Sequence, residues 1–432
     1  MCWPRPAYWP PGIPQRRVLC CSGCCSYLVP VTPAGFVEQV QAARDILDGI
    51  VIRTPLEGSR WLAKLAGGPV WLKTENLQRA GSFKIRGAYV RMSRLSAEER
   101  ARGVVAASAG NHAQGVALAA QMLGIQAVVF MPLGAPIPKE KATRGYGAEV
   151  RFAGHTVDEA LTHAQEYASR TGAILVHPFD HVDIVAGQGT CGLEILEQCP
   201  DVATILVPTG GGGLIAGIAG YVKAVRPQVR VIGVQAEGAA AYPASLAAGE
   251  PVALTQMSTM ADGIAVARPG DVPFATIADT VDDVVTISEE MLSQALLMLL
   301  ERAKLVVEPA GAAAVAALMD DPTGYPTPAV AVLSGGNIDP LLMMNVIRHG
   351  LAAAGRYLTL RVRISDHPGG LAQLLVQCAE AEANVIDVVH ERTSSRLQVG
   401  EVDIALHLET RGPQHARSVL GRLREQGYRV SD

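Results

Sequence analysis

The chain has 432 residues, of which 49% are hydrophobic and 5% aromatic, and its formal net charge is −4. This length corresponds to about two or three domains, and the apolar content is sufficient for a large core. The near-neutral charge without any Lys/Arg run argues against nucleic acid or an anionic membrane as a partner, and no apolar run approaches the ~20 residues that span a bilayer.

The N-terminal segment, residues 1–34, differs in composition from the rest. It is rich in Pro, Trp and Cys and holds five of the eight cysteines. We expect a disordered tail or the product of an early start codon. The run Cys20–Cys25 contains zinc-ligand residues, but we favour the interpretation without a metal and assign no metal site. Because the sequence shows neither a signal-peptide pattern nor a disulfide framework, the expected compartment is the cytoplasm.

From Val37 onward, short apolar segments alternate with segments of helical period. We expect strands at 70–72, 103–107, 126–131, 149–152, 173–177, 204–208, 229–235 and 329–333. We expect helices at 37–47, 85–95, 111–123, 139–146, 157–170, 189–197, 214–225, 289–303 and 311–319. This alternation predicts an α/β fold of parallel strands, and the strand count favours two sheets over one. We therefore predict one domain of two subdomains over residues 35–352.

The pattern changes near Gly355. Residues 358–364 and 402–408 alternate strictly between apolar and polar, as half-buried antiparallel strands do. Residues 371–378 and 416–423 each carry one apolar helix face. With strands at 384–393 and 428–430, the order βαββαβ predicts a ferredoxin-like module over residues 356–432.

Lys84 stands out because it follows a turn-forming Gly81-Ser82 pair and begins a predicted helix. The positive end of the helix dipole disfavours a charged ammonium there. A neutral amine serves as a nucleophile, a base or a Schiff-base partner. The alternative is a solvated surface lysine.

Four consecutive glycines, Gly210–Gly213, stand between a buried-type strand and a helix. Such a run lets backbone N–H groups close on an anion at a helix N-terminus. It is not a P-loop, because no Gly-Lys-Ser/Thr follows. A dinucleotide site is the competing interpretation, since Gly211, Gly213 and Ala216 fit G-x-G-x-x-A and Glu237 follows the next strand.

Two loops of small polar residues argue against a dinucleotide. Ser108-Ala109-Gly110-Asn111-His112 follows one predicted strand, and Ser334-Gly335-Gly336-Asn337 follows the last one. Both would lie at carboxyl ends of strands, where ligands bind in open α/β sheets. Helix capping is the alternative for either loop alone.

Together, Ser82–Ala88, Ser108–Gly115, the glycine run and Ser334–Asn337 resemble threonine dehydratase (threonine ammonia-lyase), a carbon–nitrogen lyase among the fold type II pyridoxal-phosphate enzymes. The resemblance covers about Val37 to the C-terminus. It implies that pyridoxal phosphate is held by Phe83, Lys84, Asn111, Gly210, Gly211, Gly212, Gly213, Leu214 and Ser334, with Lys84 as the catalytic Schiff-base lysine. It also implies that the substrate carboxylate is received by Ser108, Gly110 and His112.

The resemblance implies β-elimination of water from L-threonine to give 2-oxobutanoate and ammonia, with L-serine as a secondary substrate. Serine racemase is similar but carries a serine where this chain has Ala109, so racemisation should be poor. A serine or 3-hydroxyaspartate dehydratase or racemase remains an alternative, as does a vestigial amino-acid sensor.

The C-terminal module resembles an ACT domain, a regulatory unit that binds amino acids. Its Asp366–Leu371 segment is similar to the turn of that family, which implies an effector site at Gly369, Gly370 and Leu371. A structural dimerisation module is the alternative. The resemblance also implies a homo-oligomer, dimeric or tetrameric, and an allosteric enzyme of amino-acid metabolism such as isoleucine biosynthesis.

Overall fold

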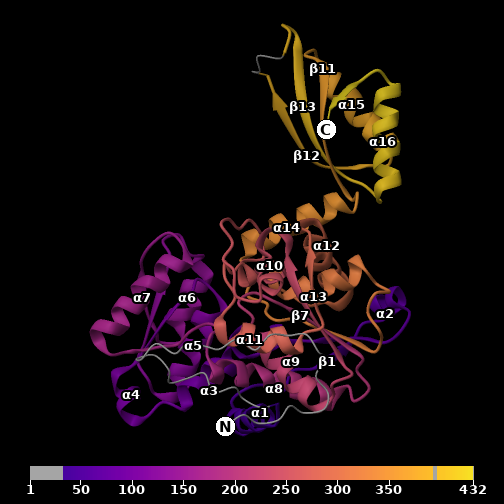
Figure 1. Cartoon of the computed structure of the whole chain (residues 1–432). Coiled ribbons are helices and arrows are strands. Elements are labelled where there is room, and N and C mark those ends of the chain that lie inside the picture. The colour runs from indigo at the N-terminus through magenta and orange to yellow at the C-terminus, as the bar shows by residue number, and fades with distance from the viewer. Residues whose placement is uncertain (1–32, 393–396, 432) are drawn as a thin grey trace.

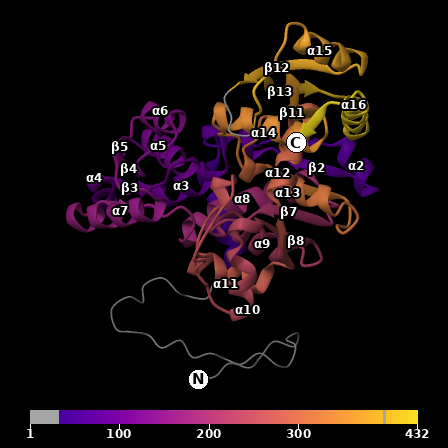
Figure 2. The same cartoon turned by 90° about the horizontal axis from the view of Figure 1, so that it is seen from above.

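The computed structural model describes residues 33–392 and 397–431. The expectations for residues 1–32, including the cysteine run, lie outside the described residues, whereas residues 33 and 34 begin α1 (Pro33–Leu47) instead of ending the tail. The described chain forms two α/β lobes followed by a C-terminal module (Figures 1 and 2). The predicted class, an α/β fold with parallel sheets and an added ferredoxin-like unit, is confirmed.

The large lobe is built on a six-stranded sheet of order β1-β2-β10-β7-β8-β9. Its strands are β1 (Leu56–Gly58), β2 (Val70–Lys73), β7 (Thr204–Pro208), β8 (Arg230–Ala236), β9 (Asp283–Ile287) and β10 (Ala329–Val332). Only β1 is antiparallel to its neighbour. One face packs on α1, α8 (Val182–Gln198) and α9 (Gly213–Val225), and the other on α12 (Glu289–Met298) and α13 (Pro309–Asp320).

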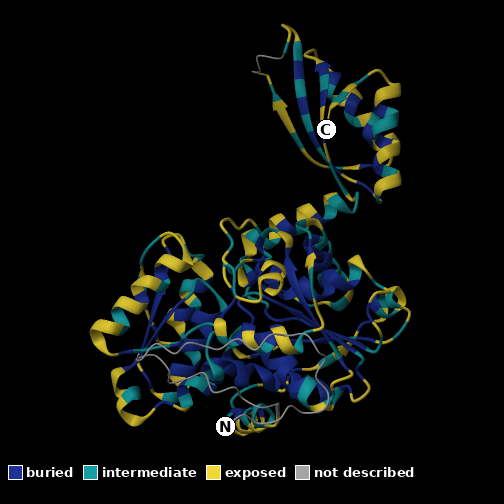
Figure 3. Cartoon of the chain, in the orientation of Figure 1, coloured by how far each residue is buried: buried dark blue, intermediate teal, exposed yellow. Residues whose placement is uncertain are grey.

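The small lobe is built on a four-stranded parallel sheet of order β5-β4-β3-β6. Its strands are β3 (Val104–Ala107), β4 (Ala127–Met131), β5 (Glu149–Phe152) and β6 (Ile174–Leu175). Helices α3 (Lys84–Ser93) and α5 (Asn111–Leu123) cover one face, and α7 (Val157–Thr171) covers the other. Because both faces are covered, the central strands are buried along their whole length (Figure 3).

Helix α8 begins seven residues before the predicted start at 189. Three glycines lie in this helix, and glycine is a poor helix former, so the sequence understated its length. The glycines allow close packing instead: a Cβ on Gly187 would lie 2.7 Å from the Cα of Gly87 in α3, and one on Gly217 of α9 would lie 2.5 Å from the nitrogen of Gly189. Helix α8 therefore packs closely between α3 and α9.

Several short elements were not predicted, namely β1, β9, α2 (Arg60–Ala66), α4 (Ala97–Arg102), α10 (Ala241–Ala248) and α11 (Asp271–Thr280). Helix α4 has no buried residue and hence no apolar face to detect. Its N-terminus does carry a capping box of Ser96 and Glu99, which was the available signal. The predicted helix 289–303 is α12 followed by a π-helical turn, Leu299–Ala303.

After α14 (Pro340–Ala353), the C-terminal module has the predicted βαββαβ order. It comprises β11 (Tyr357–Ser365), α15 (Gly370–Glu380), β12 (Asn384–Glu391), β13 (Glu401–Glu409), α16 (Pro413–Glu425) and β14 (Arg429–Ser431). The antiparallel sheet has the order β12-β13-β11-β14, and its apolar face packs against both helices.

Two further observations concern the described residues alone. None of their helices combines the length and apolarity needed to cross a membrane. They also contain no group of three or more His, Cys, Asp or Glu side chains arranged to hold a metal ion.

Candidate active site

A cavity of about 360 Å³ lies between the two lobes. It is lined by all the residues expected to hold the cofactor and to receive the substrate carboxylate: Phe83, Lys84, Ser108, Gly110, Asn111, His112, Gly210, Gly211, Gly212, Gly213, Leu214 and Ser334. These residues come from the carboxyl-terminal ends of strands in both sheets and from the helices that follow. The topology therefore brings the four sequence motifs together in one place.

Lys84 is the first residue of α3, and its side-chain nitrogen faces the cavity rather than bulk water. Its Nζ donates to the main-chain oxygen of Pro178 at 3.0 Å and lies 5.1 Å from the ring centroid of Phe83. Burial lowers the pKa of Lys84 to about 8, although Glu308 acts in the opposite direction. Desolvation is thus the main cause of the lowered pKa that we expected from the helix dipole.

The glycine run forms a turn that cannot accept larger residues. A Cβ on Gly211 would lie 2.3 Å from the ring of Phe179, and Gly212 has a φ of +99°. The carbonyl of Gly211 accepts from the Tyr242 hydroxyl at 3.2 Å and from the Gly270 N–H at 3.1 Å. The N–H groups of Gly210–Gly213 donate to no other described residue. Free N–H groups at the start of the 13-residue α9 suit a phosphate.

The amide of Asn111 is held in one orientation. Its Nδ2 donates to the carboxylate of Glu308, and its Oδ1 accepts from Asn337 Nδ2 at 2.8 Å. Asn337 in turn donates to the main-chain oxygen of Ala80 at 2.7 Å. One N–H of Asn111 consequently remains available to a ligand that offers an acceptor.

The small-polar loop before α5 is ordered by its own contacts. The hydroxyl of Ser108 accepts from the N–H of Gly110 at 3.1 Å. His112 Nε2 lies 2.8 Å from the carbonyl oxygen of Val176 and must carry the hydrogen, because a carbonyl only accepts. Burial and the nearby Lys84 lower the pKa of His112 to about 3, so this imidazole is neutral near pH 7.

The loop of Ser334 lies beside the lysine loop. The main-chain oxygen of Ser334 accepts from the N–H of Phe83 at 3.2 Å, and Ser82 forms an isolated antiparallel bridge with Gly335. Ser334 is only 4% exposed and lines the cavity. Segments some 250 residues apart are thus joined directly at the site.

Sequence reasoning missed several cavity residues, among them Lys139, His177 and Phe179. His177 follows β6 closely, so its strand-end position was the available signal. Burial lowers the pKa of His177 to about 4, and its Nδ1 accepts from the N–H of Asp180 at 2.9 Å. Lys139, from α6 (Ile137–Gly145) in the small lobe, donates to Asp262 of the large lobe at 2.5 Å.

Glu308 also lines the cavity. It is 2% exposed and precedes α13. Burial and then Asp262 raise its pKa to about 7. The carboxyl can therefore change its charge near neutral pH while in contact with Asn111.

The residues expected at an effector site lie in the C-terminal module and do not line this cavity. Gly369 has a φ of +91° and precedes α15, where the conformation favours glycine. Leu371 packs against the module core.

Comparisons with known proteins identify the family. A family model described as pyridoxal-phosphate dependent enzyme matches residues 47–335. The chain belongs to this family. Pyridoxal phosphate is therefore its cofactor, and the free N–H groups of the glycine run and the buried amine of Lys84 fit a phosphate and an aldehyde.

The chain is similar along most of its length to proteins with a stated activity. It is 48% identical over 392 residues to an L-threonine ammonia-lyase of Geobacter sulfurreducens, covering 90% of this chain and 98% of that protein. It is 45% identical over 394 residues to an L-threonine ammonia-lyase of Thermotoga maritima, covering 91% and 98%. A solved structure of the processed form of a threonine deaminase from Solanum lycopersicum has a TM-score of 0.71 and 38% identity, covering 75% of this chain and 88% of that chain.

The two matches to ammonia-lyases reach beyond the family model. That model ends at residue 335, so a match of 392 residues includes part of the C-terminal module. The likeness to the two ammonia-lyases is thus not confined to the two lobes.

Proposed function

We propose that this chain is an L-threonine ammonia-lyase that converts L-threonine to 2-oxobutanoate and ammonia, with L-serine as a secondary substrate. One observation carries the proposal: the half-buried Lys84 shares a cavity with a glycine run whose N–H groups donate to no described residue. It is supported by 45–48% identity to two proteins of that name over nine-tenths of the chain.

Each cavity residue has a part in binding the cofactor. Lys84 would hold it through Nζ, and the N–H groups of Gly210–Gly213, with Leu214, would bind its phosphate. Phe83 would pack against the ring, and the remaining N–H of Asn111 would donate to the ring hydroxyl. Ser334 would place a hydroxyl at the ring nitrogen, where it binds without supplying a full proton.

The bound cofactor supplies a sink for the electrons released when an amino acid loses its α-proton. Lys84 Nζ would take that proton. With a pKa near 8 instead of 10.5, about 300-fold more of the amine is neutral at pH 7. The loop of Ser108, Gly110 and His112 would receive the substrate carboxylate, with the His112 imidazole neutral. The β-hydroxyl leaves with one proton as water, and the released enamine tautomerises to an imine. Addition of one water to that imine gives 2-oxobutanoate and ammonia, so the overall reaction balances.

Ala109 favours elimination over racemisation. It lines the cavity beside Gly110, and its methyl group can neither donate nor accept a proton. Return of a proton to the substrate from a second side chain at this position is therefore unavailable. A serine or 3-hydroxyaspartate dehydratase would need the same residues, so the choice of substrate is decided by assay.

The proposal is tested with purified holoenzyme and L-threonine, L-serine, D-serine and 3-hydroxyaspartate, with detection of 2-oxo acids. We expect the highest kcat/KM for L-threonine and no D-serine from L-serine. Lys84→Ala should abolish product, whereas Lys64→Ala on the exposed surface of α2 should not. Absence of bound cofactor after reconstitution would favour the amino-acid sensor, and a preference for another substrate would overturn the threonine assignment.

We also propose that the C-terminal module binds an amino acid that regulates a dimeric or tetrameric cytoplasmic enzyme. The βαββαβ order and the left-handed Gly369 before α15 support this proposal. Branched-chain amino acids would be titrated into the full chain and into a chain ending at residue 355, with sedimentation of both. A response that persists in the shortened chain would rule out the module as the effector site.

A further inference from the structure

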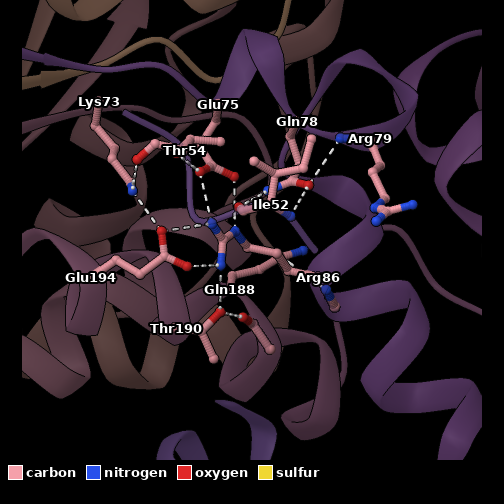
Figure 4. A network of polar contacts seen from close by, with 12 residues as sticks. Ile52, Thr54, Lys73, Glu75, Gln78, Arg79, Arg86, Gln188, Thr190 and Glu194 are labelled. Carbon is pink, nitrogen blue, oxygen red and sulfur yellow. Dashed lines mark hydrogen bonds and ion pairs between the residues drawn. The ribbon is translucent and has the colours of Figure 1, made fainter. Parts of the chain in front are cut away.

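We propose that Arg86 is a positioning residue for Lys84: a buried cluster around its guanidinium fixes the first turn of α3 on α8 and so fixes the lysine. The cluster consists of Lys73, Glu75, Arg86, Thr190 and Glu194, and is called the Arg86 cluster here. Figure 4 shows the guanidinium between the two carboxylates. The proposal rests on the role of Lys84 proposed above.

All five N–H groups of Arg86 are used. Its Nε and Nη2 donate to the two oxygens of Glu75, each at 2.8 Å. Its Nη1 and Nη2 donate to the two oxygens of Glu194 at 2.7 and 3.0 Å, and Nη1 also donates to the hydroxyl of Thr190 at 3.1 Å. Such a fork fixes position and direction together, which a point charge does not.

The second cation of the cluster is saturated in the same way. Lys73 Nζ donates to Glu194 at 2.5 Å, to Gln198 at 2.9 Å and to the main-chain oxygen of Thr54 at 2.9 Å. Two cations and two anions balance in charge, and Arg86, Glu75 and Lys73 are all 0% exposed. A buried network that is fully satisfied is rigid and specifies one arrangement.

The cluster joins four elements, the fourth being the 3₁₀ helix Glu75–Leu77 that contributes Glu75. Arg86 lies in the first turn of α3, Glu194 and Thr190 lie on α8, and Lys73 ends β2. The same turn is held by the N–H of Gly87, which donates to Gln188 of α8 at 3.3 Å. The N-terminus of α3 has no side-chain cap, so it is fixed by these bonds to α8 together with the N–H of Phe83, which donates to the main-chain oxygen of Ser334.

Two further contacts confine Lys84, one with α5 and one with the segment that precedes α8. A Cβ on Gly115 of α5 would lie 3.1 Å from the Cβ of Lys84, so Lys84 packs closely against α5. The acceptor of its Nζ, Pro178, stands four residues before the start of α8. The start of α8 therefore positions Pro178, the acceptor of the Lys84 amine, while the Arg86 cluster holds the backbone of Lys84 in α3 against the same helix.

A purely structural cluster would contribute stability without setting the environment of the amine. The chain offers a matched comparison at the other end of α3. Arg94 follows the last residue of the helix and pairs with Asp183 of α8, but its side chain is 30% exposed. Arg86→Lys and Arg94→Lys both keep the charge and weaken an α3–α8 contact, one beside Lys84 and one about ten residues away.

The experiment uses competitive acetylation of the full, cofactor-free chain across pH, with Lys84 and the exposed Lys64 quantified by mass spectrometry. In Arg86→Lys we expect the midpoint of Lys84 labelling to rise by roughly one unit or more toward the ~10.4 of a free lysine, because water reaches a displaced amine. Glu308, His112 and His177 also act on this charge and are the same in every variant. Arg94→Lys should leave the midpoint unchanged.

Two companion measurements complete the test. In the reconstituted enzyme, a shift of Lys84 by ~1 Å should lower kcat by about a hundredfold in Arg86→Lys. If Arg86→Lys does not fold, Thr190→Val removes one hydrogen bond of the guanidinium and should give a smaller rise in the midpoint. Equal midpoints in the Arg86, Thr190 and Arg94 variants at matched thermal stability would overturn the proposal. Because labelling needs no cofactor or turnover, that failure is distinct from a failure of the ammonia-lyase activity.

Discussion

Gly212 provides the sharpest test of the turn proposed to bind the phosphate, because substitution there has two separate energetic costs. Its φ of +99° is unfavourable for any residue with a Cβ, which costs about 1–2 kcal/mol. The added methyl would also lie 1.9 Å from the Tyr242 hydroxyl and 2.8 Å from Ile277. Overpacking of this kind costs about 1–3 kcal/mol. Gly212→Ala should therefore lose about 2–5 kcal/mol in the free energy of unfolding.

Gly249 is the matched control. It also has a positive φ, +71°, but a Cβ there would meet nothing within 4 Å. Gly249→Ala should lose only the backbone cost of about 1–2 kcal/mol and should bind the cofactor normally.

The assay is urea unfolding of the cofactor-free proteins together with titration of pyridoxal phosphate. Displacement of Tyr242 should move the Gly211 carbonyl that it holds, so Gly212→Ala should also bind the cofactor more weakly. Equal losses of stability in the two variants, with equal cofactor affinity, would refute the argument that this turn is shaped by packing around an anion site.

Three further predictions concern charge and protonation in the cavity. The pKa of Lys84 in the cofactor-free fold is about 8, against 10.5 for an ordinary lysine, so between these pH values the unfolded chain binds more protons and the free energy of unfolding rises with pH. In urea unfolding, Lys84→Met should raise the free energy of unfolding by on the order of 3 kcal/mol below pH 8 and should leave it unchanged above pH 10.5. The pKa of Glu308 is raised from 4.5 to about 7, so its contribution to the free energy of unfolding falls as the pH rises through that range. Glu308→Gln should remove this pH dependence of the free energy of unfolding and should flatten the pH profile of activity near pH 7. An unchanged pH dependence of stability would contradict the argument. Ala109→Ser should allow D-serine to form from L-serine in a chiral assay, whereas Ala109→Val should not.

The parts of the site that could be predicted from sequence are those fixed by topology. Parallel strands place their carboxyl ends on one edge, so the loops that contain Lys84, Asn111, Gly210–Gly213 and Ser334 were expected to converge before their distances were known. Strand bounds at 149–152 and 204–208 agree with β5 and β7 because short apolar runs between turns leave little freedom.

The remainder depends on side chains that meet only in the folded chain. Glu75 and Glu194 contact Arg86 from 11 residues before it and 108 residues after it. No periodicity relates such positions, and each acid alone resembles a surface residue. The pKa of Glu308 is likewise set by burial and by Asp262, which a linear pattern does not contain.

Two contacts between the lobes differ in burial, and this difference determines which part of the cavity changes first if the lobes move. Lys84 is tied to the large lobe by an Arg86 cluster that is almost fully buried and saturated with hydrogen bonds. The rim contact between the lobes, Lys139 with Asp262, involves an acid whose side chain is 53% exposed, so water screens it and it breaks at low cost. Relative movement of the lobes would then alter the rim and the substrate loop before it altered the lysine. Because the Arg86 cluster attaches Lys84 to the large lobe, which also holds Gly210–Gly213, we expect Lys84 to keep its position relative to that glycine run if the lobes move.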